Sequence, residues 1–120
     1  MQSAYDAFQE GNRLLASQNP HAAVIALERA RDLEPDKASV RETLARAYYG
    51  TGRFTQAGEE FERAVEIEPV NDYAHFGLGL CLLRAGERVA ARGHLKLAVA
   101  MRPDNADYRA ALAQTLDPPE

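Results

Sequence analysis

Apolar residues recur every three or four positions along most of the chain, which is the spacing of one buried face of an α-helix. In the middle of the chain Leu44 and Tyr48 form one such stripe, and Phe61, Ala64 and Val65 form the next. No segment shows the alternating pattern of a half-buried strand. The pattern predicts an all-α fold with helices over residues 4–17, 20–34, 37–50, 54–68, 71–84, 88–102 and 105–116.

Glycine, asparagine and proline mark the predicted helix ends. Gly52 and Gly86 each follow a stripe and can adopt the left-handed conformation that ends a helix. In the first part of the chain Asn19 can cap the next helix, and Pro20 suits its first position. Further caps are expected from Asp36, Asn71 and either Asp104 or Asn105.

The chain has a 34-residue period, which is marked by the evenly spaced prolines Pro35, Pro69 and Pro103. The same offset relates the alanine sets Ala23, Ala57, Ala91 and Ala30, Ala64, Ala98, and the bulky set Leu27, Phe61, Leu95. So many matches at one offset indicate three copies of a two-helix unit. We assign one domain over 1–116, with repeats 4–37, 38–71 and 72–105 and an end helix 106–116, followed by a tail over 117–120.

The second copy holds small residues at Ala45, Ala57 and Ala64, bulky residues at Tyr48 and Phe61, and proline at Pro69. The tetratricopeptide repeat (TPR) family places the same residue types at the corresponding positions of its own 34-residue pattern. The chain resembles that family over residues 4–105, and residues 106–116 resemble its solvating end helix. The resemblance implies a right-handed superhelical solenoid of antiparallel helix pairs.

The chain departs from the TPR pattern at the position where the family has tryptophan, which here holds Ala7, Arg41 and His75. In the first copy Glu10 also stands where the later copies have leucine. A terminal repeat needs a polar outer face, because no neighbour covers it. We therefore expect the array to begin with this repeat.

Composition and charge narrow the possible functions. A chain of 120 residues that is 46% hydrophobic and 27% charged is typical of one globular domain. The net charge of −4 argues against nucleic-acid binding, although the third copy by itself is basic. No window approaches the roughly 18 apolar residues that span a bilayer, and no secretory signal is present. The single cysteine, Cys81, allows no intrachain disulfide, so we expect a soluble cytoplasmic protein without membrane insertion.

No combination of residues predicts catalysis, so we expect no enzymatic activity, metal or cofactor. The three histidines lie on different predicted helices, and we expect His75 to be packed against its neighbours. Cys81 is expected to be buried and unreactive. The acidic run of the fourth predicted helix is expected to face solvent; it comprises Glu59, Glu60, Glu62, Glu66 and Glu68.

The TPR resemblance implies that the first helix of each pair lines a concave groove. The residues that we place in this groove are Tyr5, Phe8, Gln9, Asn12, Thr43, Arg46, Tyr49, Tyr73, Phe76, Gly77, Leu80 and Arg84. Aromatic and leucine side chains on an exposed surface are typical of binding sites. Alternatively, Tyr49 and the nearby Leu83 pack between neighbouring helices.

Some TPR domains hold the acidic tails of heat-shock chaperones with a clamp of lysine, asparagine and arginine side chains. The matching positions of this chain hold Phe8, Asn12, Thr43, Tyr73 and Gly77. Only Asn12 has the residue that the family uses. The basic residues that would pair with a carboxylate are missing, so the sequence argues against this specialised function.

We therefore predict a non-catalytic protein-interaction module that binds an extended segment or a short amphipathic helix of a protein partner. Gly77 is expected to leave a recess beside Tyr73 and Phe76 for an apolar anchor, while Arg46 and Arg84 add polar selectivity. One alternative is a secretion-type chaperone that shields an apolar client segment. Another is a scaffold that self-associates end to end, whereas the groove hypothesis expects a monomer.

Overall fold

The computed structural model describes residues 1–116, which form seven α-helices and no strand. The helices are α1 (Ala4–Ala16), α2 (Pro20–Leu33), α3 (Ala38–Gly50), α4 (Phe54–Ile67), α5 (Asp72–Arg84), α6 (Arg88–Met101) and α7 (Ala106–Ala113). The predicted all-α class is confirmed. The tail assigned to 117–120 lies outside the described residues.

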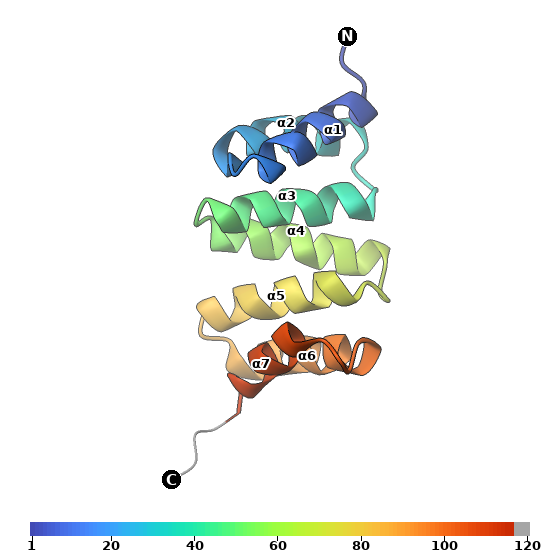
Figure 1. Ribbon diagram of the computed structural model, residues 1–120. Coiled ribbons are helices and arrows are strands. Elements are labelled where there is room, and N and C mark those ends of the chain that lie inside the picture. Colours follow the sequence, from blue (N-terminus) through green and yellow to red (C-terminus); the bar gives the residue numbers. More distant parts are fainter. Residues whose placement is uncertain (117–120) are drawn as a thin grey trace.

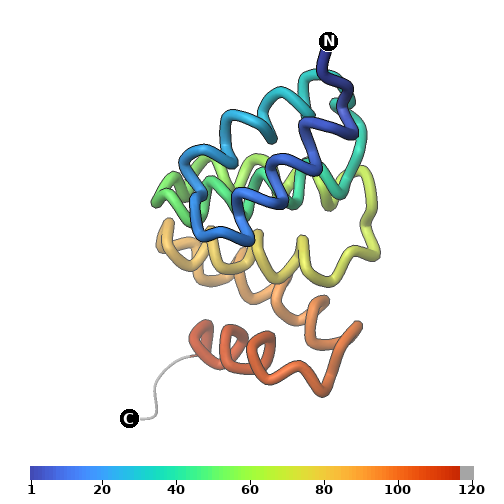
Figure 2. Tube along the Cα trace, turned by 45° about the horizontal axis from the view of Figure 1, so that its top comes forward, coloured from blue at the N-terminus to red at the C-terminus, as the bar shows by residue number. Residues whose placement is uncertain are grey.

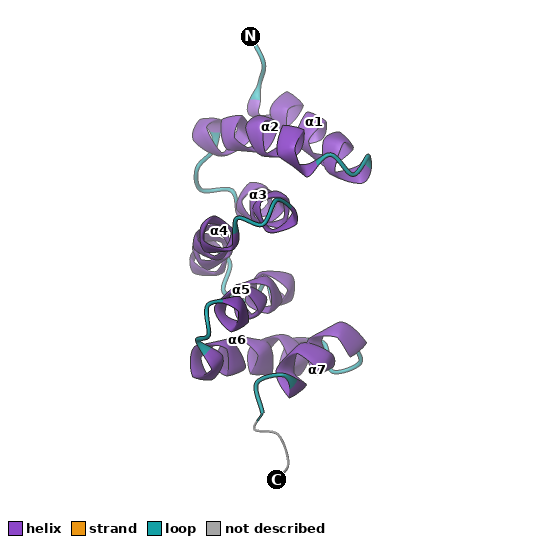
Figure 3. Cartoon of the chain, turned by 90° about the vertical axis from the view of Figure 1, so that its left-hand side faces the viewer, coloured by secondary structure: helices purple, strands orange, loops and turns teal. Residues whose placement is uncertain are grey.

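The helices stack in chain order as antiparallel pairs, with α1 and α7 at opposite ends of a molecule about 58 Å long (Figure 1). Helix axes change direction from one pair to the next, which gives the stack a superhelical course (Figure 2). Figure 3 views the stack from the side, with α4 to the left of α3 and α6 to the left of α7. Each helix contacts only near neighbours in this order, which defines a solenoid. Within residues 1–116 no helix is long and apolar enough to cross a bilayer.

Most of the predicted helix ends are confirmed. Gly52 and Gly86 have φ of 81° and 80°, the left-handed conformation expected of them. The side chains of Asn19, Asn71 and Asn105 each accept a hydrogen bond from a backbone N–H of the helix that follows.

Two details of the helix ends differ from the prediction. Asp36 does not cap α3, because Lys37 is the capping residue and its side chain makes no cap hydrogen bond. The Asp36 carboxylate instead accepts a hydrogen bond of 2.6 Å from Arg63 of α4. The end helix stops at Ala113, because the Thr115 N–H bonds to the Leu112 carbonyl at 3.0 Å and so tightens the last turn.

The helices of a pair approach closely because a bulky residue of the second helix packs on a glycine of the first. A β-carbon on Gly79 would lie 2.5 Å from Leu95 Cγ, and one on Gly11 would overlap Leu27 in the same way. Leu27 and Leu95 are fully buried. The small residues of the repeat pattern are therefore the points of closest helix approach.

In the second repeat the bulky residue is Phe61, and the first helix of its pair carries Ala45 at the position of these glycines. The Phe61 ring reaches Gly77 of α5, where an added β-carbon would overlap the ring atoms Cζ and Cε1. The Phe61 ring therefore takes the place that a side chain at Gly77 would occupy. Gly77 joins the second repeat to the third.

We expect Gly77→Ala to lower the free energy of unfolding by about 1–2 kcal/mol, because the Phe61 ring must shift inside a close-packed core. The matched control is Gly93→Ala, since Gly93 lies within α6 and its β-carbon would meet nothing within 4 Å. That variant should gain about 0.5–1 kcal/mol from helix propensity alone. Urea titration followed by circular dichroism measures both, and equal gains in the two variants would show that Phe61 does not constrain Gly77.

Candidate functional site

The first helices of the second and third repeats form an apolar hollow, which we call the α3–α5 pocket. Its volume is about 260 Å³. Its lining residues are Arg46, Tyr49 and Gly50 of α3, Phe61 of α4, and Tyr73, Phe76, Gly77 and Leu80 of α5. Six of the residues that the sequence places in the groove thus meet in one pocket: Arg46, Tyr49, Tyr73, Phe76, Gly77 and Leu80.

Aromatic contacts hold the rings of this pocket in place. The Tyr73 ring lies edge-on to Phe61, with centroids 6.2 Å apart, and 6.0 Å from Phe76. Burial raises the pKa of the Tyr73 hydroxyl, although the nearby Arg46 cation opposes this. The Phe76 ring packs on Tyr108 of α7 at 4.7 Å. Phe76 therefore supports the end helix as well as lining the pocket.

A second hollow adjoins the first, because Tyr49 and Leu80 line both. We call it the Arg84 pocket; it measures about 360 Å³, and its other lining residues are Leu83, Arg84 and Gln114. The Arg84 guanidinium lies 4.2 Å from the Phe54 ring centroid, and its Nε donates a hydrogen bond of 3.0 Å to the Tyr49 hydroxyl. These contacts fix the exposed cation at the rim of the pocket.

Five predicted groove residues line neither pocket. Tyr5 is 67% exposed, and its hydroxyl accepts a hydrogen bond of 2.7 Å from Gln9. Phe8 packs against the core between the first two repeats, and Asn12 of α1 is half-buried outside both pockets. Thr43 is buried, and its hydroxyl donates to the Ser39 carbonyl at 2.8 Å. The structure therefore gathers the predicted site on α3 and α5 and leaves the α1 residues apart.

The pockets also contain residues that the sequence did not single out for binding. Gly50 lies one repeat period before Arg84 but was not placed in the groove, and Phe61 was assigned to the core alone. Gln114 was missed because the repeat pattern was not extended through the end helix. It lies one repeat period after Leu80, which itself lies one period after Arg46. The period would therefore have found Gln114.

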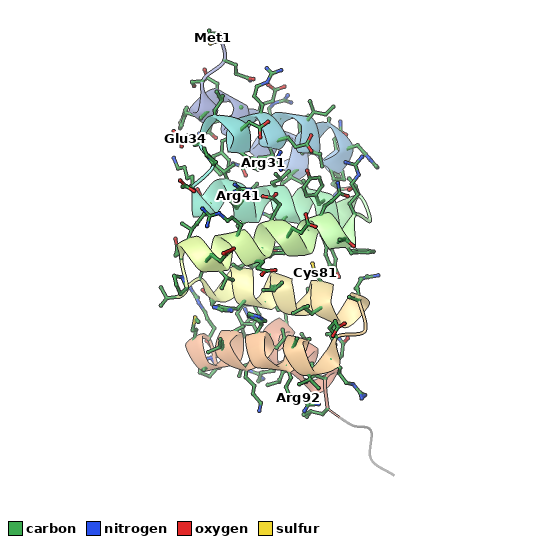
Figure 4. All side chains as sticks on the ribbon, turned by 180° about the vertical axis from the view of Figure 1, so that it is seen from behind. Met1, Arg31, Glu34, Arg41, Cys81 and Arg92 are labelled. Carbon is green, nitrogen blue, oxygen red and sulfur yellow. The ribbon has the colours of Figure 1, made fainter. Side chains whose placement is uncertain are left out.

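The sequence predicted that the acidic run of α4 faces solvent. Glu60 departs from this prediction, because it is buried. Its carboxylate accepts hydrogen bonds from Arg31 of α2 at 3.1 Å and from Arg41 of α3 at 2.8 Å. Figure 4 labels the two arginines, which lie on neighbouring helices. Burial disfavours the Arg31 cation, but Glu60 and Asp32 outweigh it and raise the pKa of Arg31. This ion-pair network connects the first two repeats, and Arg31, Arg41 and Glu60 line neither pocket.

Two residues considered for other chemistry, Cys81 and His75, are packed inside the fold. Cys81 is buried, and burial raises the pKa of its thiol to about 11 despite the nearby Arg84 cation. His75 is also buried, as predicted, but its ring contacts His94 of α6, a pairing that the sequence did not predict. Within residues 1–116 no three side chains gather as metal ligands.

The repeats match known proteins along most of the chain. Residues 8–72 and 42–106 each match the tetratricopeptide repeat family model. The chain belongs to the tetratricopeptide repeat family. It is 32% identical over 109 residues to the TPR repeat-containing thioredoxin TTL4 of Arabidopsis thaliana, which covers 91% of this chain and 16% of the relative. It is also 32% identical over 103 residues to the tetratricopeptide repeat and J domain-containing co-chaperone DNJ1 of Cryptococcus neoformans, with 86% and 20% covered. The chain thus spans a fifth or less of these two relatives.

Solved TPR structures have the same fold. The first TPR of Spaghetti (RPAP3), bound to an HSP90 peptide, superposes with a TM-score of 0.89 at 18% identity, covering 95% of this chain and 90% of that one. The Arabidopsis OM64 TPR domain gives 0.89 at 20% identity, with 93% of each chain covered. YrrB, described as a TPR protein with an unusual peptide-binding site, gives 0.86 at 22% identity, with 97% and 59% covered. At these identities the similarity shows the fold.

We expect Cys81 to react with iodoacetamide at pH 8 about a hundredfold more slowly in the folded protein than in guanidinium. The shift of its pKa from 9.0 to about 11 lowers the thiolate fraction by two decades. Mass spectrometry of timed samples measures both rates. Similar rates with and without denaturant would show that the thiol is accessible and ionisable in the fold.

Proposed function

We propose that this protein is a non-catalytic protein-interaction module that binds a peptide segment of a partner in the α3–α5 and Arg84 pockets. The observation that carries the proposal is the pair of adjoining hollows joined by Tyr49 and Leu80. A preformed apolar hollow of this kind receives a partner side chain without first having to fold. The partner would be a protein, and the domain a monomer.

The pockets favour a particular peptide chemistry. The α3–α5 pocket is lined mainly by rings and leucine, which suits a large apolar side chain as the anchor. Arg46 lies in this pocket and Arg84 in the next, and both are exposed. An acidic side chain near the anchor would meet one of these cations and form a charge-assisted hydrogen bond. We therefore expect an extended peptide with apolar and acidic residues close together.

Similar proteins support peptide binding as the class of function. The RPAP3 domains are described in complex with HSP90 and HSP70 peptides. This chain retains only Asn12 of the chaperone-tail clamp, and Asn12 lines neither pocket. We therefore expect the peptide to contact side chains of α3 and α5 other than those of the clamp.

The alternatives receive less support. End-to-end assembly would require an apolar end face, yet the α1 residues that match Val40 and Leu44 of α3 are Asp6 and Glu10. Nothing in the described residues distinguishes a secretion-type chaperone from a general peptide-binding module. The buried free thiol of Cys81 suits a reducing compartment, and we propose the cytoplasm.

We expect peptides selected from a random phage-displayed library to bind with micromolar affinity, and Arg46→Glu to weaken that binding at least about tenfold, or 1.4 kcal/mol. Leu80→Ala should weaken it similarly, because Leu80 lines both pockets. Calorimetric titration of synthetic copies of the selected peptides measures both effects.

The matched control is Lys96→Glu, which makes the same charge change on an exposed residue of α6 away from both pockets. It should leave affinity within about twofold, and thermal unfolding should show that all three variants remain folded. Selected peptides whose affinity falls equally with Lys96→Glu and Arg46→Glu would indicate general charge attraction. Peptides indifferent to both Arg46 and Leu80 would bind elsewhere, and the proposed site would be wrong.

A further inference from the structure

The side chain at one position of the repeat contacts the carbonyl of the preceding proline in three successive copies. Arg41 Nε donates to the Pro35 carbonyl at 2.9 Å, and Arg109 Nη1 donates to the Pro103 carbonyl at 2.7 Å. His75 is the equivalent residue of the third repeat, one period after Arg41 and one before Arg109. Its Nε2 lies 2.8 Å from the Pro69 carbonyl. Each of these side chains ties the start of a helix to the loop before it. This is the position where the TPR pattern has tryptophan.

The same side chains differ in their second contact. In the second repeat Arg41 Nη1 lies 2.8 Å from the Glu60 carboxylate of α4. In the third repeat His75 Nδ1 lies 3.0 Å from Nδ1 of His94 on α6. Glu60 and His94 are one repeat period apart and therefore equivalent. The contact between the first and second helices of a repeat, which we call the joint, is thus a pair of histidines in the third repeat and an arginine with a glutamate in the second.

The geometry determines where the protons of the neutral pair lie. A carbonyl oxygen only accepts, so His75 Nε2 carries a hydrogen and donates it to Pro69. His75 Nδ1 is then a bare acceptor, and the contact of 3.0 Å requires His94 Nδ1 to carry the donated hydrogen. One added proton can bind to His94 Nε2, which keeps the contact but places a cation in a half-buried site beside His75. A second would place two N–H groups against each other.

The side chains around the two histidines compensate only part of the positive charge that protonation would add. The two rings are stacked with centroids 5.3 Å apart, and His75 is 4% exposed. From α4, Glu62 faces His94, and Glu66 lines a small surface hollow together with Glu62 and His94. At the start of α5, Asp72 is engaged by Tyr108 of α7 at 2.7 Å and by Arg102 at 3.4 Å. The α7 cation Arg109 is bound to the Pro103 carbonyl.

We infer that the His75–His94 contact makes the joint between α5 and α6 sensitive to pH in the range where imidazole titrates. The neutral pair holds the joint together, and protonation of the pair loosens it. The equivalent contact of the second repeat, between Arg41 and Glu60, contains no imidazole. Acidification therefore weakens the third repeat, whereas the second repeat has no histidine pair at the equivalent position.

The sign follows from the protons bound in each state. Burial and the neighbouring His75 lower the pKa of His94 below its ordinary 6.5, although Glu62 opposes this. The unfolded chain then binds more protons than the fold between pH 6.5 and that lowered pKa. The stabilisation is complete above pH 6.5 and is lost as the pH falls through this window. The unfolding constant rises up to about tenfold per pH unit for each proton.

The test transplants the joint of the second repeat into the third with the double variant His75→Arg/His94→Glu. Guanidinium unfolding is measured at intervals from pH 7.5 to 5 in the original and variant proteins. The original should become markedly less stable over this range, and the double variant should lose most of that dependence. His21→Gln is the matched control, because His21 is exposed, and it should keep the full dependence.

Two further measurements decide the matter if the double variant does not fold. His94→Gln retains a side-chain donor towards His75 and should flatten the pH dependence between pH 6.5 and 5. Nitrogen-15 spectra of the original protein at pH 7.5 should show the Nε2–H tautomer for His75 and the Nδ1–H tautomer for His94. The Nε2–H tautomer in both rings, or a pH dependence that His94→Gln leaves intact, would overturn the inference.

Discussion

The bulky side chain of each second helix must find room against a first helix, and glycine provides that room throughout the stack. Leu27 and Leu95 pack on a glycine of their own pair, whereas the larger Phe61 ring reaches Gly77 of the next repeat. The spacing of α3, α4 and α5 depends on this contact, because close-packed interiors tolerate little displacement. The α3–α5 pocket depends on it too, since Phe61 forms one of its walls.

Stability and binding share side chains at this site. Tyr73 contacts both Phe61 and Phe76, and Phe76 packs on Tyr108 of the end helix. Rings held by one another lose little conformational freedom when a partner arrives, which favours tight binding. The same arrangement makes truncation of Phe76 a poor probe of affinity, because it also releases α7. Arg46, which is exposed at the rim, separates the two effects.

The repeat period was enough to predict the helices and their pairing, and the resemblance to TPR proteins indicated most of the α3 and α5 residues that line the pocket. Local capping was also predictable, except at Asp36, where a distant arginine captures the carboxylate. Contacts between side chains far apart in sequence were not predictable from the period. The burial of Glu60 and the pairing of His75 with His94 depend on which helix faces arrive together, and periodicity fixes only positions along each helix. Extending the same period into α7 would have added Gln114.

Contacts confined to neighbouring helices also govern how the molecule comes apart. No helix of the first repeat touches the third, so opening at one end does not require the other end to open. The turn before α2 differs from the later turns. Gln18 there takes the left-handed conformation, with φ of 59°, that glycine adopts in the later turns, and this conformation is unfavourable for a residue with a side chain. Partial unfolding should therefore begin at the ends of the array, while the middle keeps its amides protected from exchange with solvent.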